Sequence, residues 1–127
     1  MDNIVIKTLD APKAIGTYSQ GIRYGNLVFT SGQIPLNPET GELINGDFKL
    51  EISQVLTNLN GVLKNGGSSL KKAIKLTVFL TDISYFPQIN EVFKEFFPEN
   101  PPARSLVQVS ALPMNAKIEI EAIGSVE

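Results

Sequence analysis

The feature that most constrains the fold is a pair of amphipathic stretches with one strand-like stretch between them. Residues 48–64 carry apolar side chains at the spacing of one helix face, namely Ile52, Val55, Leu56, Leu59, Val62 and Leu63. A shorter stretch that ends before Phe97-Pro98 repeats this pattern with Ile89, Val92, Phe93 and Phe96. Between them, Ala73–Leu80 alternates apolar and other residues, as a half-buried strand does. Each helix has one apolar stripe, which must be buried against another element such as a sheet. The pattern therefore predicts an α+β domain.

Five further runs have the composition of strands: residues 4–7, 22–24, 27–34, 103–109 and 117–122. Gly25-Asn26 separates the second run from the third and is typical of a hairpin turn. Gly32 permits a bulge or the close approach of another group. The chain therefore predicts the order β-β-β-α-β-α-β-β in one domain of residues 1–127, with both helices on one face of the sheet.

The other face of this sheet lacks a helical cover. It exposes Lys75, Thr77, Phe79, Glu119 and Glu121, and it mixes apolar and charged positions with Leu106 or its neighbours. A partly apolar face of this size is typical of an interface between subunits. We therefore expect a homo-oligomer assembled through this face.

Composition excludes several classes of chemistry. The 127 residues include no cysteine and no histidine, so thiol nucleophiles, disulfides, Cys/His zinc sites and histidine-dependent dyads are ruled out. We expect neither a metal nor another cofactor. The net charge of −2, with no cluster of basic residues, argues against nucleic-acid binding on electrostatic grounds. No run has the length of a membrane span and the first residues lack the features of a signal peptide, so we expect a cytoplasmic protein.

Arg104 is one of only two arginines, and it follows Pro101-Pro102, which favour an extended backbone. Its planar fork suits a small carboxylate or phosphate, although an arginine at a strand start is more often a surface charge or an ion-pair partner. The other arginine, Arg23, is interpreted as surface charge. Glu119 and Glu121 share the outward face of an alternating strand, which alone explains their polarity.

Five stretches, in this order and at this spacing, closely resemble the Rid (YjgF/UK-type) family of reactive-intermediate deaminases. They are Gly16–Gln20, Phe29–Gln33, Asn90-Glu91, Pro102–Ser105 and Lys117–Ala122. The resemblance runs over nearly the whole chain, and the Pro-Ala-Arg-Ser and Ile-Glu-Ile-Glu segments are its most specific part. It implies a chorismate-mutase-like (YjgF-like) fold with a mixed six-stranded sheet, and a homotrimer with a central barrel and three clefts between subunits.

The same resemblance implies the residues of the site. Arg104 corresponds to the arginine that binds the substrate carboxylate, and Glu119 to the acid that handles the attacking water, so both are the expected catalytic residues. The other residues expected to bind substrate are Tyr18, Ser31, Gly32, Asn90 and the main chain of Leu106. Leu106 stands where many relatives have cysteine, which leaves only a main-chain role. Thr17 stands where many have proline.

The function implied is hydrolysis of 2-imino acids, such as 2-iminobutanoate and 2-iminopropanoate, to 2-keto acids and ammonia without a cofactor. One alternative is a regulatory or chaperone-like protein that binds small carboxylates through Arg104 without catalysis. Another is an RNA-cleaving inhibitor of translation, which the lack of histidine and of a basic cluster disfavours. Glu119 favours catalysis over simple binding.

Overall fold

A computed structural model describes residues 2–127 and contains the predicted strands and helices in the predicted order. The elements are β1 (Ile4–Ile6), β2 (Gly21–Tyr24), β3 (Leu27–Thr30), α1 (Phe48–Asn65), β4 (Ala73–Leu80), α2 (Phe86–Phe96), β5 (Ala103–Gln108) and β6 (Ile118–Ser125). Short 3₁₀ turns lie at Leu70–Lys72, Ile83–Tyr85 and Pro113–Asn115. None of the helices in this part of the chain is both long and apolar enough to cross a membrane.

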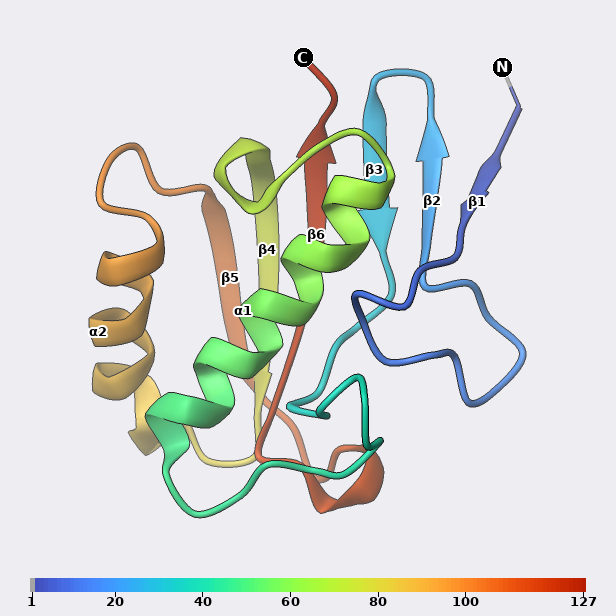
Figure 1. Cartoon of the computed structure of the whole chain (residues 1–127). Helices are drawn as coiled ribbons and strands as arrows, with labels where there is room; N and C mark the ends of the chain where they lie inside the picture. Colours follow the sequence, from blue (N-terminus) through green and yellow to red (C-terminus); the bar gives the residue numbers. More distant parts are fainter. Residues whose placement is uncertain (1) are drawn as a thin grey trace.

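The six strands form one sheet in the order β1-β2-β3-β6-β4-β5 (Figure 1). The β4–β5 pair is parallel and every other neighbouring pair is antiparallel, so the sheet is mixed, as expected. The parallel strands β4 and β5 are joined through α2, because a parallel pair needs a crossover connection. This arrangement makes β5 the outermost strand at one edge, beside α2 (Figure 1).

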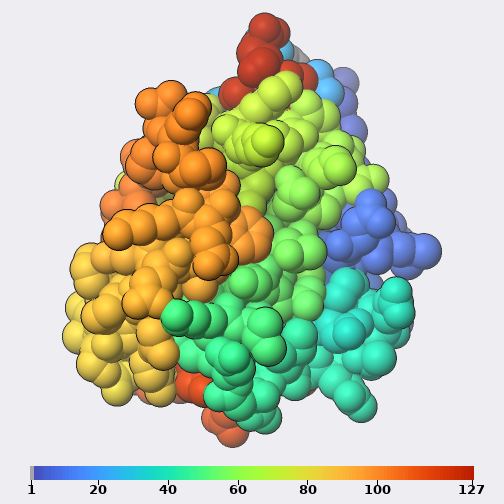
Figure 2. Space-filling model, turned by 60° about the vertical axis from the view of Figure 1, so that its left-hand side comes forward, coloured from blue at the N-terminus to red at the C-terminus, as the bar shows by residue number. Residues whose placement is uncertain are grey.

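Both helices lie on the same face of the sheet, which confirms the prediction. α1 crosses the middle strands, and α2 lies beside its first turns (Figures 1 and 2). The core between the layers contains the apolar stripes of both helices and the inward residues of β4 and β6. Its fully buried members include Ile52, Leu56, Leu59, Leu76, Val78, Leu80, Ile89, Ile118 and Ile120. Each such side chain contributes roughly 1.5–3 kcal/mol by leaving water.

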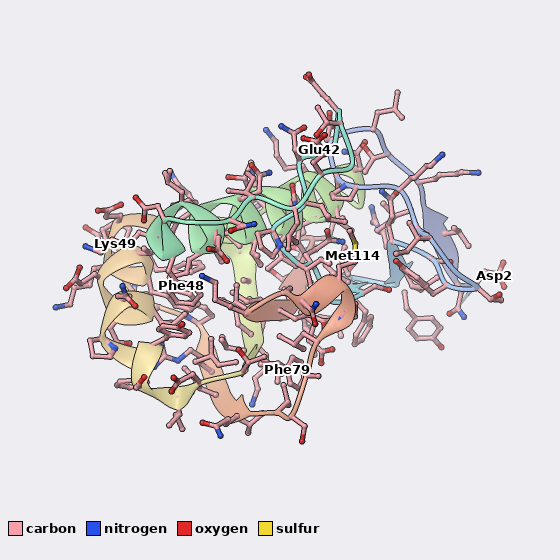
Figure 3. All side chains as sticks on the ribbon, turned by 90° about the horizontal axis from the view of Figure 1, so that it is seen from below. Asp2, Glu42, Phe48, Lys49, Phe79 and Met114 are labelled. Carbon is pink, nitrogen blue, oxygen red and sulfur yellow. The ribbon has the colours of Figure 1, made fainter. Side chains whose placement is uncertain are left out.

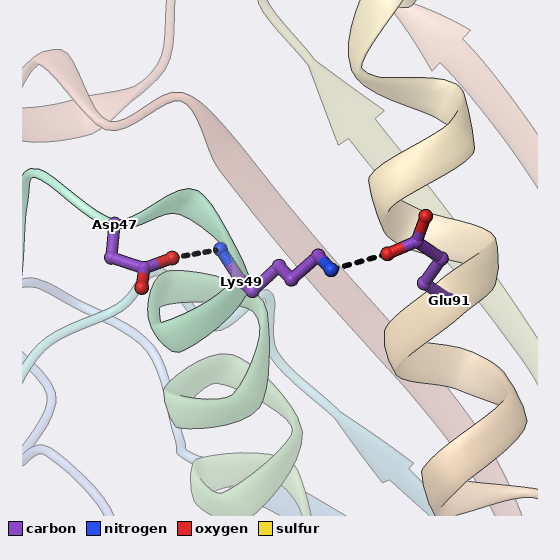
Figure 4. Close-up of polar contacts among 3 residues, drawn as sticks. All are labelled: Asp47, Lys49 and Glu91. Atoms are coloured by element: carbon purple, nitrogen blue, oxygen red, sulfur yellow. Dashed lines mark hydrogen bonds and ion pairs between the residues drawn. The ribbon is translucent and has the colours of Figure 1, made fainter.

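The start of α1 is fixed by a cap and tied to α2. Asp47 accepts a hydrogen bond from the Lys49 backbone N–H at 3.0 Å, and the Lys49 ammonium pairs with Glu91 of α2 (Figure 4). The pairing raises the pKa of Lys49 and lowers that of Glu91. Pro87 lies in the first turn of α2, where its missing N–H has no helical partner to lose.

The face without helices carries the outward residues of β4 and β6. Phe79 pairs with Glu119 across these strands, and Thr77 pairs with Glu121. Figure 3 shows Phe79 on the side of the sheet away from α1. On β5 the residues of this open face are Ser105 and Val107, in register with Thr77 and Phe79. The suggestion that Leu106 itself lies there is wrong, because Leu106 is in register with buried Val78 and packs against the core.

Two local expectations also need correction. Within the strand-like run of residues 27–34, whose clear strand pattern ends at Gly32, the strand itself ends at Thr30. Pairing resumes only at Gln33, which exchanges backbone hydrogen bonds with Ile120. Arg23 is no simple surface charge. Its guanidinium donates to the carbonyl oxygens of Gly25 and Gly66, at 3.1 and 3.3 Å, so it fixes the end of α1 against the first hairpin.

Candidate functional site

Four of the expected site residues lie together around one hollow on the open face of the sheet. Tyr18, Ser31, Gly32 and Glu119 line a cavity of about 440 Å³, and we call these four residues the acid half-site. The other lining residues are polar or apolar and include one cation: Glu121, Gln33, Lys13, Pro12, Ile15, Ile34, Leu36 and Pro113. A carboxylate beside a hydroxyl and apolar walls is suited to orienting a water against a small organic molecule.

The interruption after β3 is the place where the Glu119 side chain approaches the backbone. A Cβ atom at position 32 would overlap the Glu119 carboxylate, so any other residue there would force the Glu119 side chain to move. The strand is held on either side of this gap, because Ser31 N–H donates to the Gln20 carbonyl at 2.9 Å and Gln33 N–H donates to Ile120 at 2.8 Å. The sequence indicated that Gly32 permits the close approach of another group, and in the structure that group is Glu119, the expected catalytic acid.

Glu119 is half-buried, and its surroundings favour the neutral form of its carboxyl group. Burial raises the pKa of Glu119, and the negative charge of Glu121 on the same face raises it further. A carboxylate with a raised pKa binds a proton more tightly and is a stronger base. This is the direction required of a group that takes a proton from water near neutral pH.

Tyr18 lies on a loop that one buried side chain holds in place. The amide of Gln20 donates to the carbonyls of Thr8 and Pro12, at 3.0 and 2.8 Å, and accepts from the Thr8 N–H at 2.7 Å. The Ser31 hydroxyl donates to the Ser19 carbonyl at 2.6 Å, which ties the loop to the site. Tyr18 itself remains 49% exposed. Its ring is therefore available to a ligand or to another subunit.

The remaining site residues lie elsewhere, at the β5 edge next to α2. The Arg104 guanidinium donates from Nη1 to the Asn90 side-chain oxygen at 3.0 Å. Leu106 follows two residues later on the same strand and the same side. We call Arg104, Asn90 and Leu106 the arginine half-site. Arg104 and Asn90 line a separate hollow of about 460 Å³, together with Phe93, Lys94, Phe97, Pro101 and Pro102.

The two half-sites of one chain face opposite sides of the sheet. Arg104 is in register with Leu76, which is buried beneath the helices, whereas Glu119 pairs with Phe79 on the open face. Residues paired in register project to the same side, so Arg104 and Glu119 project to opposite sides. One chain does not bring the expected carboxylate-binding arginine and the expected acid to the same hollow.

Two features of the site were not anticipated from the sequence. Gln20 is the last residue of one family motif, and nothing in its local sequence indicates that its side chain holds the loop that carries Tyr18. Phe93 was assigned to the core stripe of its helix, yet its ring also faces the Arg104 guanidinium. The spacing of Phe86, Asn90 and Phe93 along one helix face is the signal that could have grouped them. No group of three or more potential metal ligands occurs within residues 2–127.

Comparisons with known proteins agree over the whole length of the chain. The family model described as Endoribonuclease L-PSP matches residues 8–126. A RutC family protein of Pyrococcus abyssi is 49% identical over 119 residues, which is 94% of each chain. A 2-iminobutanoate/2-iminopropanoate deaminase of Dermatophagoides farinae is 42% identical over 97% of this chain and 96% of its own.

The fold has equally close counterparts among solved structures. The crystal structure of Escherichia coli TdcF with bound serine superimposes with a TM-score of 0.91 at 46% identity, and covers 96% of this chain and 98% of that one. Identities of this level over nearly complete chains establish common descent and a common fold. The chain therefore belongs to the Endoribonuclease L-PSP family, which is the Rid (YjgF) family that its sequence motifs resemble.

Proposed function

We propose that this protein hydrolyses small 2-imino acids, such as 2-iminobutanoate and 2-iminopropanoate, to 2-keto acids and ammonia. A relative named for this reaction is 42% identical over nearly the whole chain, which supports the proposal. A second relative of the same fold has serine bound, and serine shares with a 2-imino acid a carboxylate next to a carbon that bears nitrogen. The site residues of this chain match the chemistry of such a substrate.

The observation that carries the proposal is the placement of Arg104 and Glu119 on opposite faces of one sheet. A substrate that needs both groups requires a second copy of the chain, whose acid half-site faces the arginine half-site of the first. We therefore propose a homotrimer whose sites lie between subunits. The exposed apolar residues of the open face, among them Val107 and Phe29, supply a surface for such contacts.

The chemistry divides between the two half-sites. Arg104 binds the substrate carboxylate with two parallel hydrogen bonds, each worth on the order of 1.5–3 kcal/mol. Glu119 accepts a proton from a water molecule while the water oxygen attacks the imine carbon, and the imine nitrogen takes a proton from solvent. The product of this addition carries a hydroxyl and an amino group on one carbon. It collapses to the 2-keto acid as Glu119 gives its proton to the departing ammonia and the hydroxyl proton returns to solvent.

The main chain of Leu106 is the group we assign to the imine nitrogen. β5 is the edge strand, so alternate backbone groups of this strand point away from the sheet and are available to a ligand. Asn90 holds Arg104, and Tyr18 and Ser31 close the opposite side of the substrate. This division leaves no step that needs a thiol, a histidine or a cofactor.

A coupled assay tests the proposal. A threonine dehydratase generates 2-iminobutanoate, semicarbazide traps the imine that remains free, and release of the keto acid is compared with and without the protein. The wild type should accelerate release, and Arg104→Ala should lower kcat/KM by about 100-fold or more because both carboxylate bonds are lost. Arg104→Lys should recover only part of this loss, since an ammonium lacks the planar fork.

The control removes an exposed cation outside the site. Lys72→Ala should have the same kcat/KM as the wild type. Wild-type protein that leaves the rate at the buffer value contradicts the deaminase proposal. In that case Arg104-dependent binding of 2-oxobutanoate, a stable keto acid, would support the binding protein without catalysis.

A further inference from the structure

The Arg104 guanidinium lies against two aromatic rings of α2. Its Cζ atom is 5.4 Å from the ring centroid of Phe86 and 5.3 Å from that of Phe93. Asn90, which accepts the hydrogen bond from Nη1, lies between these residues on the same helix face. A cation within about 6 Å of an aromatic ring face is attracted by the negative charge density of that face. One helix thus contacts the guanidinium with two rings and one amide.

The charge of Arg104 is balanced by these groups rather than by an acid. Within residues 2–127 the ion pairs are Lys49–Glu91 and Lys117–Glu51, and neither involves Arg104. Burial lowers the pKa of Arg104, which indicates that its charge is partly removed from water. A carboxylate partner would have neutralised this charge and competed with the carboxylate of a substrate.

The aromatic contact also leaves the hydrogen-bond donors free. A guanidinium carries five N–H groups in one plane, and the bond to Asn90 uses a donor on Nη1. A ring face attracts the cation without accepting any of the in-plane donors. The other donors can therefore still form a fork around a planar anion.

Phe93 is the better fixed of the two rings. It is 7% exposed, packs in the main core and lies 5.5 Å from the ring of Phe97, whereas Phe86 is 42% exposed. We propose that Phe93 is a positioning residue, whose ring fixes the plane of the Arg104 guanidinium for a bidentate bond to a carboxylate. The proposal rests on the proposed function, because it assumes that Arg104 binds the substrate carboxylate.

Binding of 2-oxobutanoate, measured by titration calorimetry on the assembled wild-type protein and its variants, tests this role separately from catalysis. Phe93→Leu should raise the Kd about 10-fold, since a ring contact to a partly desolvated cation is lost. Phe93→Tyr keeps the ring face and should bind within about 2-fold of the wild type. In the hydrolysis assay, Phe93→Leu should raise KM more than it lowers kcat.

Phe48→Leu is the matched control, because Phe48 is 6% exposed and stacks on Tyr85, away from Arg104. It removes the same atoms from the core and should leave the Kd unchanged. Adding Phe93→Leu to Arg104→Ala should cause no further loss, because the ring acts only through the arginine. If Phe93→Leu does not fold, Phe93→Met keeps the bulk without the ring and replaces it.

The outcomes separate the two proposals. Loss of affinity in Arg104→Ala and Phe93→Leu, with Phe93→Tyr and Phe48→Leu unaffected, supports the positioning role. An affinity of Phe93→Leu equal to that of the wild type, or equal losses in Phe93→Leu and Phe48→Leu, overturns the role of Phe93 while Arg104 keeps its own. Unchanged affinity in Arg104→Ala overturns the carboxylate-binding arginine, and with it both proposals.

Discussion

At the scale of single residues, partial burial affects the two charged groups of the site in different ways. It raises the pKa of Glu119, so it brings the titration of this carboxyl group closer to neutral pH. It lowers the pKa of Arg104, but a guanidinium stays protonated in proteins at any ordinary pH. In the proposed reaction, the charge that holds the substrate is therefore constant, whereas the charge that activates water depends on pH.

The neighbouring acid should raise the pH at which activity appears, in addition to the larger effect of burial. Glu121 raises the pKa of Glu119 through charge repulsion, so Glu121→Gln should lower that pKa. Because Glu119 must be ionised to accept a proton, the acid limb of the kcat/KM profile should move to lower pH in this variant. Glu42→Gln, in the exposed loop before α1, should leave the profile unchanged. An acid limb that stays in place, or moves to higher pH, would contradict the role of Glu119 as the base.

Removal of the Glu119 charge should stabilise the protein while it slows the reaction. A carboxyl group whose pKa is raised by folding opposes folding at any pH where it is ionised. Glu119→Gln should therefore have a higher Tm than the wild type at neutral pH, and the difference should vanish as the pH falls through the pKa of Glu119. The rate should fall by roughly 10²-fold or more. A lower Tm at neutral pH in Glu119→Gln would show that the carboxylate is structural.

At the scale of elements, the sequence predicts each helix and strand from its own period, but not the contacts between them. The apolar stripes of α1 and α2 and the alternation of β4 and β6 were sufficient to predict that helices pack on one face of a sheet. They also predicted which face of each element is buried. The position of Arg104 against α2 was not accessible in this way, because it depends on the register of the parallel β4–β5 pair. For the same reason the sequence alone does not decide on which face of the sheet Leu106 lies.

The interruption after Thr30 shows the same limit. Gly32 indicates that another group approaches closely, but its local sequence does not say which group. The partner, Glu119, lies 87 residues further along the chain (119 − 32) and reaches Gly32 through the packing of β6. Family resemblance named both residues for the site, and the structure shows that they lie in close contact.

The loop that carries Tyr18 should depend on Gln20. This side chain is 4% exposed and satisfies several backbone groups of residues 8–12, so Gln20→Leu leaves them without partners. The free energy of unfolding should fall by about 1–3 kcal/mol. Chemical denaturation measures this loss, and Gln88→Leu in α2 is the matched exchange that should cost less. Equal stability of Gln20→Leu and the wild type would show that the loop does not need this network.

At the scale of the whole molecule, the proposed function makes both assembly and activity depend on the open face of the sheet. A monomer would leave Phe29 and Val107 exposed and Phe79 partly exposed to water, and would keep the half-sites apart. Assembly through this face covers these apolar groups and can bring the acid half-site of one chain to the arginine half-site of another. Loss of assembly and loss of activity should therefore occur together.

A charge at the edge of the open face should dissociate the oligomer. Val107 is 43% exposed on β5, and Val107→Lys places an ammonium where we expect contact between subunits. Light scattering after size-exclusion chromatography should show monomers with unchanged circular dichroism and no imine hydrolysis. Ile83→Lys, at a residue that is 51% exposed away from this face, should keep the assembly. Fully active Val107→Lys monomers would contradict a site shared between chains.

The most direct test of the shared site is complementation between two inactive variants. Arg104→Ala and Glu119→Gln carry different tags and are co-expressed, so that mixed oligomers can be purified through both tags. A trimer purified through both tags contains two copies of one variant and one of the other, so a site with both native residues forms at about one of its three interfaces. We predict that mixed oligomers recover about a third of the wild-type rate, while each variant alone stays inactive. Mixed oligomers as inactive as their parents would contradict it, because Arg104 and Glu119 would then have to act within one chain.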